Sequence, residues 1–151
     1  MHSNPIISVQ FVEGEVDIQK HSTLPTTGCG GECLFVGRTR PEHHDKHGEL
    51  LELSYDCYQT LAQTKLEQLA NEAVARFGVR TINICHSTGS VPINGVSVVI
   101  AVASEHRDDA FHACRFLIDL LKLHVPIWKQ EIWEDGTTWS AGIPLPDELK
   151  T

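Results

Sequence analysis

The chain has 151 residues and a formal net charge of −8 at pH 7, with 41% hydrophobic and 21% charged residues. A chain of this length fits one domain around a single core, burying roughly 68–70% of its unfolded surface. The negative charge excludes a broad surface for nucleic acid or an anionic membrane, because both need a positive field. Any anionic ligand must therefore be met by a local group of cations.

The sequence contains neither a membrane-spanning pattern nor a secretory one. No apolar run reaches the roughly 20 residues that span a bilayer, and the first ten residues lack a basic region followed by an apolar stretch. The cysteines lack CxxC spacing; they are Cys29, Cys33, Cys57, Cys85 and Cys114. We therefore expect a cytosolic protein whose thiols are free and mostly buried.

The first half of the chain predicts three strands and a long helix. Residues 7–11 alternate between apolar and polar, as in a half-buried strand, and a short helix and a loop follow. Residues 32–37, "ECLFVG", are apolar on both faces, which predicts a central strand. After a polar loop over residues 37–49, residues 50–56 form another strand. A helical period then runs over residues 59–77, as far as a capping glycine.

The second half predicts two long strands, a second helix and two short strands. Residues 79–87 and 96–104 are strands joined by "TGSVPING", a hairpin-like connection. Asp108 and Asp109 open the second helix, which ends before Pro126. Two short strands follow, over residues 127–133 and 137–142. The order indicates a single α+β or mixed α/β domain over residues 1–151.

Cationic side chains gather at the ends of three predicted elements. Lys122 is informative because it follows Leu121 and lies four residues after Ile118, so it borders the buried stripe of the second helix. The pattern suggests a compact anion pocket, in which partly desolvated lysines act as acid, base or nucleophile. The alternative is that these charges are solvated at loop edges. The residues concerned are Arg38, Arg40, His106, Arg107, Lys122 and Lys129.

The segment "PEHHDKHGE" is rich in histidine, with His43, His44 and His47 close together. His43 and His47 are four residues apart, a spacing that could hold a metal on a helix. The surrounding proline, glycine and charged residues instead indicate a mobile loop. We therefore expect no metal site and no other cofactor, although a histidine-rich metal-binding protein stays a third hypothesis.

Four motifs in one register, from about Gly30 to Trp139, resemble the catalytic (large) subunit of molybdopterin synthase, the MoaE family. "GGECLFVGRTR" is similar to a family strand and loop, and "LSYDCYQTLA" to the segment that leads into the first long helix. "SEHRDDAF" resembles a strand-to-helix turn, and "LLKLHVPIWKQE" the lysine-bearing end of the last helix.

The resemblance implies a sulfurtransferase of molybdenum cofactor biosynthesis. Such an enzyme inserts two sulfurs into cyclic pyranopterin monophosphate, taking them from the C-terminal thiocarboxylate of a small ubiquitin-like carrier subunit that ends in Gly-Gly. The expected assembly is a homodimer within a heterotetramer, with the carrier tail threaded into the active site. The expected fold is α/β hammerhead-like with an added antiparallel part.

The resemblance also assigns roles to individual residues. Lys122 falls on the lysine nearest the terminal glycine of the carrier, and with Lys129 it is expected to be catalytic and to contact substrate. The other expected substrate contacts are Arg38, Thr39, Arg40, His106, Arg107, Gln130 and Glu131.

This chain departs from the family pattern at several positions, none of them a lysine of the site. Gly31 replaces a usual alanine, Ser87 a frequent arginine, and Gln130 a basic residue. The rival from another class is a non-catalytic homologue that only docks the carrier.

Overall fold

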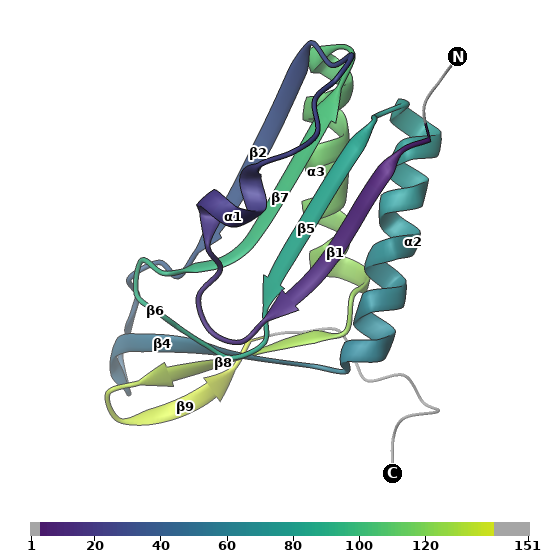
Figure 1. Cartoon of the computed structure of the whole chain (residues 1–151). Helices are drawn as coiled ribbons and strands as arrows, with labels where there is room; N and C mark the ends of the chain where they lie inside the picture. The colour runs from purple at the N-terminus through teal and green to yellow at the C-terminus, as the bar shows by residue number, and fades with distance from the viewer. Residues whose placement is uncertain (1–3, 141–151) are drawn as a thin grey trace.

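The computed structural model describes residues 4–140, which form two β-sheets and three helices (Figure 1). The larger sheet contains β1 (Ile6–Val12), β2 (Gly31–Arg38), β5 (Thr81–Ser87) and β7 (Val96–Ser104), in the order β1-β5-β7-β2. β1 runs parallel to β5, and the other pairs are antiparallel. β5 and β7 are buried along their whole length, and β7 has the near-continuous apolar sequence that is typical of such a strand.

Two long helices cover one face of this sheet, and a short one lies on the other (Figure 1). α2 (Gln59–Phe77) ends where Gly78 adopts the left-handed conformation, with φ of 67°, and α3 (Arg107–His124) packs beside it. The main core lies between these helices and the sheet, built on Leu66, Ile84 and Leu117 among others. On the opposite face α1 (Ile18–Ser22) covers a smaller apolar cluster.

The second sheet is antiparallel and is added at one end of the first (Figure 1). It contains β3 (His43–His44), β4 (Gly48–Cys57), β8 (Ile127–Trp133) and β9 (Gly136–Trp139) in that order, with β6 (Ser90–Pro92) paired to β4. Pro126 follows α3 and turns the chain directly into β8. The mixed α/β fold with an added antiparallel part is therefore confirmed.

The prediction that residues 32–37 form a central strand is wrong. β2 pairs only with β7 and lies at the edge of the larger sheet. Its burial alternates along the strand, and Leu34 is 46% exposed. An apolar sequence on both faces is therefore not enough to place a strand at the centre, because here the outward face simply meets solvent.

Smaller differences concern the connections and the thiols. The segment over residues 37–49 is not wholly irregular, since β3 forms a hairpin with β4, and β6 was not foreseen. The last strand is β9, and residues 141–142 of the predicted strand lie outside the described residues. All the cysteines are free, but only Cys85 and Cys114 are buried, so "mostly buried" is wrong. Among residues 4–140 no helix is long and apolar enough to cross a membrane.

Candidate active site

A cavity of about 270 Å³ lies where the two sheets meet the C-terminal end of α3. Its walls come from β2, β4, β5, β7, α3 and β8, so it exists only once both sheets are assembled. The lining residues are Phe35, Gly37, Arg38, Leu53, Tyr55, His86, Ser97, Val98, Ile118, Leu121, Lys122, Ile127, Lys129 and Ser140.

Lys122 reaches this cavity because of its position in the last turn of α3. Ile118 and Leu121 are buried against the sheet, whereas Lys122 is exposed at the edge of their stripe, as the sequence predicts. An ammonium group also suits a helix C-terminus, where unpaired carbonyls carry partial negative charge. The same helix end therefore contributes both an apolar wall and a cation.

Lys129 is brought to the cavity by the pairing of β8 with β4. In that antiparallel register Lys129 lies opposite Tyr55, so the two side chains share one face of the sheet. The backbone carbonyl of Lys129 accepts hydrogen bonds from the N–H and the hydroxyl of Ser140, each at 3.0 Å. Lys129 is half-buried, which leaves its side chain fewer orientations than a surface lysine has.

Arg38 enters from the end of β2, where the pairing with β7 shifts register after Gly37. A Cβ at Gly37 would meet Val98 Cγ1 at 2.6 Å, so the absence of a Cβ leaves room for the Val98 side chain at the cavity wall. Arg38 Nη1 donates a 2.8 Å hydrogen bond to the carbonyl of Asn94. The guanidinium is thereby anchored to the turn after β6 while it lines the cavity.

Thr39 and Arg40 follow Arg38 but do not line the cavity. Thr39 is fully buried, and its backbone N–H donates to the Gly95 carbonyl at 3.0 Å, so it ties the loop to the turn after β6. The side chain of Arg40 is 82% exposed and pairs with Glu42 at 3.0 Å. Within one chain, only the first of the three predicted loop contacts faces the site.

His106 and Arg107 lie at the other end of α3. Arg107 opens the helix and Lys122 lies fifteen residues further on, which places them roughly 22 Å apart along the axis at about 1.5 Å per residue. His106 is the N-cap residue, and its ring is 74% exposed beside Glu105. The predicted single pocket containing all the cations is therefore not formed within one chain.

Gln130 and Glu131 continue β8 beyond Lys129, and neither lines the cavity. Gln130 pairs with Ser54 and Trp139 in the sheet register. The carboxylate of Glu131 accepts a 3.0 Å hydrogen bond from the Thr138 hydroxyl. Both residues hold the strand that presents Lys129.

An uncharged polar wall was missed by the sequence reasoning. It consists of Tyr55, His86 and Ser97, which line the cavity although none of them was predicted to contact substrate. His86 is 4% exposed, and burial lowers its pKa to about 4. The hydrogen bond to the Ser87 carbonyl acts in the opposite direction but is the smaller effect. Burial raises the pKa of Tyr55, while a hydrogen bond with Ser97 lowers it. The available signal was weak: His86 is the one ionisable imidazole in the strand "TINICHS", which also contains three uncharged polar residues.

The charges of the cavity suit an anion. Three cationic side chains from three elements, Arg38, Lys122 and Lys129, line it, and among the described residues that line it there is no carboxylate. Because the protein as a whole has a net charge of −8, it does not attract an anion from a distance. An anionic ligand is instead bound by direct contacts with the cations that line the cavity. The ammonium groups can also donate protons to a departing oxygen.

Comparisons with known proteins identify the family of this chain. A family model described as MoaE protein matches residues 11–124. The chain belongs to the MoaE family. It is 33% identical over 139 residues to the "Molybdopterin synthase catalytic subunit" of Oryza sativa subsp. indica, covering 91% of this chain and 71% of the relative. The human protein of the same name is 37% identical over 134 residues, covering 88% and 70%.

A solved structure extends the likeness to three dimensions. The crystal structure of molybdopterin synthase from Staphylococcus aureus superposes with a TM-score of 0.79 at 32% identity, covering 87% of this chain and 95% of that chain. The match to the MoaE family begins at residue 11, whereas the motifs that resemble the family begin only at about Gly30. It includes α3 as far as its last residue and therefore Lys122.

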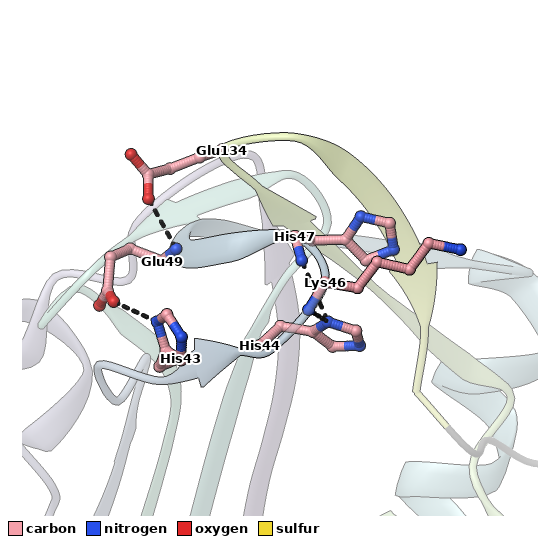
Figure 2. Close-up of polar contacts among 6 residues, drawn as sticks. All are labelled: His43, His44, Lys46, His47, Glu49 and Glu134. Atoms are coloured by element: carbon pink, nitrogen blue, oxygen red, sulfur yellow. Dashed lines mark hydrogen bonds and ion pairs between the residues drawn. The ribbon is translucent and has the colours of Figure 1, made fainter.

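The histidine-rich segment of this MoaE protein is an ordered hairpin in which the His43 and His44 rings make hydrogen bonds to different groups (Figure 2). His43 Nδ1 pairs with Glu49 Oε1 at 2.5 Å. His44 Nδ1 accepts hydrogen bonds from the backbone N–H groups of Lys46 and His47, at 3.1 and 3.2 Å. Within residues 4–140, no three histidine, cysteine or acidic side chains converge as metal ligands. The hairpin is thus held by local hydrogen bonds, which is a structural use of these rings.

Proposed function

We propose that this chain is the catalytic subunit of molybdopterin synthase and that the cavity beside Lys122 is where sulfur is transferred. The substrate would be cyclic pyranopterin monophosphate, and the sulfur donor the C-terminal thiocarboxylate of a small ubiquitin-like carrier ending in Gly-Gly. The product would be the dithiolene of molybdopterin. The reaction would take place in the cytosol, and residues 1–151 would act as one domain.

The observation that carries this proposal is the cluster of Arg38, Lys122 and Lys129 around one cavity. Both reactants are anionic, because one carries a cyclic phosphate and the other a thiocarboxylate. Cations from three different elements can hold two anions close together, and charge-assisted hydrogen bonds are about twice as strong as neutral ones. Outside such a cluster, a protein of net charge −8 would repel both reactants.

The chemistry requires a proton at a departing oxygen. In each transfer the thiocarboxylate sulfur forms a bond to a carbon of the pterin as the bond from that carbon to oxygen breaks. Water then cleaves the acyl–sulfur bond, so the sulfur stays on the pterin and the carrier leaves as a carboxylate. An ammonium group beside the reacting carbons supplies that proton and stabilises the negative charge that develops. We assign this work to Lys122, at the mouth of the cavity, and substrate binding to Lys129 and Arg38.

The remaining substrate contacts are proposed to come partly from a second copy of the chain. His106 and Arg107 lie roughly 22 Å from Lys122 along α3 at about 1.5 Å per residue, too far to touch one small substrate from the same chain. In a homodimer within a heterotetramer, these residues of one copy would complete the cavity of its neighbour. Thr39, Arg40, Gln130 and Glu131 would support the loop and strand that carry Arg38 and Lys129.

The rival function is a non-catalytic homologue that binds the carrier without turnover. Such a protein would need an exposed docking surface but would not need cations from three different elements around one cavity. The geometry therefore favours the enzyme, and a direct assay separates the two.

The deciding experiment is reconstitution with purified components: this protein, a thiocarboxylated Gly-Gly carrier and the cyclic pterin. We expect dithiolene product in amounts set by the carrier, two carriers for each product. A carrier with an ordinary carboxylate terminus is the matched control and should give none. A folded protein that binds the thiocarboxylated carrier yet forms no product would establish the docking function instead.

A further inference from the structure

The uncharged polar wall of the cavity contains His86, a histidine that lies outside the four sequence motifs. His86 is the penultimate residue of β5, on the same face as Ile82 and Ile84, which pack under the long helices. Its ring lies beyond that apolar core and lines the cavity next to Tyr55, with the ring centroids 5.0 Å apart in an edge-to-face arrangement. A buried histidine is thereby placed against the space reserved for substrate.

Hydrogen bonding fixes which ring nitrogen carries the proton. Nδ1 of His86 lies 2.7 Å from the carbonyl oxygen of Ser87. A carbonyl only accepts, so Nδ1 must be the protonated nitrogen. Burial lowers the pKa of His86 to about 4, so near pH 7 the ring is neutral and Nε2 carries a lone pair. Among the described residues Nε2 has no hydrogen-bond partner.

We propose that Nε2 of His86 accepts a hydrogen bond from an N–H group of the pterin ring system, making His86 a substrate-recognition residue of the sulfur-transfer site. The inference rests on the proposed function. Different parts of the cavity would then contact chemically different parts of the substrate. The anionic end of the substrate would contact Arg38, Lys122 and Lys129. The uncharged rings of the substrate, which carry N–H groups, would contact the imidazole of His86 and the phenol of Tyr55.

The surroundings of His86 favour a flat ring over a peptide as the partner. Tyr55 and Phe35 add aromatic surface to the same cavity, which suits stacking or edge contacts with a heteroaromatic ligand. The terminal peptide N–H groups of the carrier are the other source of the same donor chemistry. Separate affinities for the two ligands distinguish these sources.

Two matched variants test the assignment. His86→Asn keeps an N–H near the Nδ1 position to donate to Ser87 but removes the acceptor at Nε2, whereas His86→Gln places an amide oxygen near Nε2. Dissociation constants for the cyclic pterin and for the carrier are measured separately by calorimetry, with Tm as the measure of folding. We expect His86→Asn to weaken pterin binding about tenfold, as the loss of one buried hydrogen bond does, and to leave carrier binding unchanged. His86→Gln should recover most of the loss.

Three results would overturn the proposal. The first is that His86→Asn binds the pterin as tightly as the wild type does. The second is that His86→Asn weakens binding of the carrier and not of the pterin. The third is that both variants lose affinity for pterin and carrier equally and have a lower Tm, which would indicate a purely structural role. If wild-type protein binds no pterin, the proposed function fails along with this inference. If wild type forms product while His86→Asn binds pterin normally, only the role of His86 is wrong.

Discussion

The two ends of α3 both carry cationic side chains, but they differ in what surrounds them. At the C-terminal end, Lys122 borders a cavity whose other walls come from both sheets. At the N-terminal end, His106 is largely exposed and pairs only loosely with Glu105, at 3.7 Å. The C-terminal end of α3 therefore contributes to a cavity shared by several elements, whereas His106 and Arg107 at the N-terminal end do not line it. Motifs that look equivalent in sequence need not share a pocket.

The largest expected effect is at the C-terminal end of α3, beside the cavity. Replacing Lys122 with alanine removes the ammonium group assigned to protonation, and we expect product formation to fall about 100-fold or more, the scale of general acid catalysis. Carrier binding should stay near normal, measured by calorimetry on the same preparation. Full activity in Lys122→Ala would move the catalytic role to Lys129, whose alanine variant is the natural comparison.

The exposed end is tested by mixing defective subunits. Lys122→Ala and Arg107→Ala damage opposite ends of α3, and each protein alone should be impaired at low pterin concentration. If the two ends meet only across a dimer, random reassortment leaves about a quarter of the sites intact and restores activity to that level. No gain in activity after verified subunit exchange would show that both residues serve a site within one chain.

A smaller effect concerns the stability of the protein at acidic pH, which depends on His86 in the cavity wall. The folded pKa of His86, about 4, lies below its ordinary value of 6.5, so between these pH values the unfolded chain binds more protons. The free energy of unfolding should therefore fall as pH drops from 6.5 to 4, by about 3 kcal/mol from this group.

The matched control for this effect is His86→Gln, which has no titrating ring. Denaturant unfolding at several pH values, compared between the two proteins, isolates His86 from His21, whose pKa burial also lowers. Parallel pH profiles in wild type and variant would contradict the buried neutral imidazole.

The smallest effect is expected just outside the cavity. Arg40 is exposed and pairs with Glu42, so Arg40→Ala should change the KM for the pterin by about twofold at most. Arg38→Ala removes a cavity cation and should raise the same KM several-fold more. Equal effects of the two substitutions would mean that the loop after β2 moves when substrate binds.

Sequence reasoning located the elements of this protein well because its patterns are local. The helix over residues 59–77 has the predicted bounds, and the position of Lys122 beside a buried stripe follows from helical periodicity alone. What failed was long-range information. Whether β2 has one neighbour or two depends on the order of strands, which its own apolar residues do not encode.

The cavity wall shows the same limit. In the sequence His86 is one of four polar residues of β5, and only the packing of the second sheet against this strand makes it a cavity residue. The separation of Lys122 from Arg107, by contrast, could have been inferred from helix length, since about 1.5 Å per residue already places them at opposite ends.

A crystal structure of the dimer with the cyclic pterin bound tests the central claim most directly. We expect the pterin in the cavity at the C-terminal end of α3, with its phosphate within hydrogen-bond distance of Arg38, Lys122 or Lys129 and a ring N–H facing His86. Pterin bound only beside His106 and Arg107, with that cavity empty, would contradict the account.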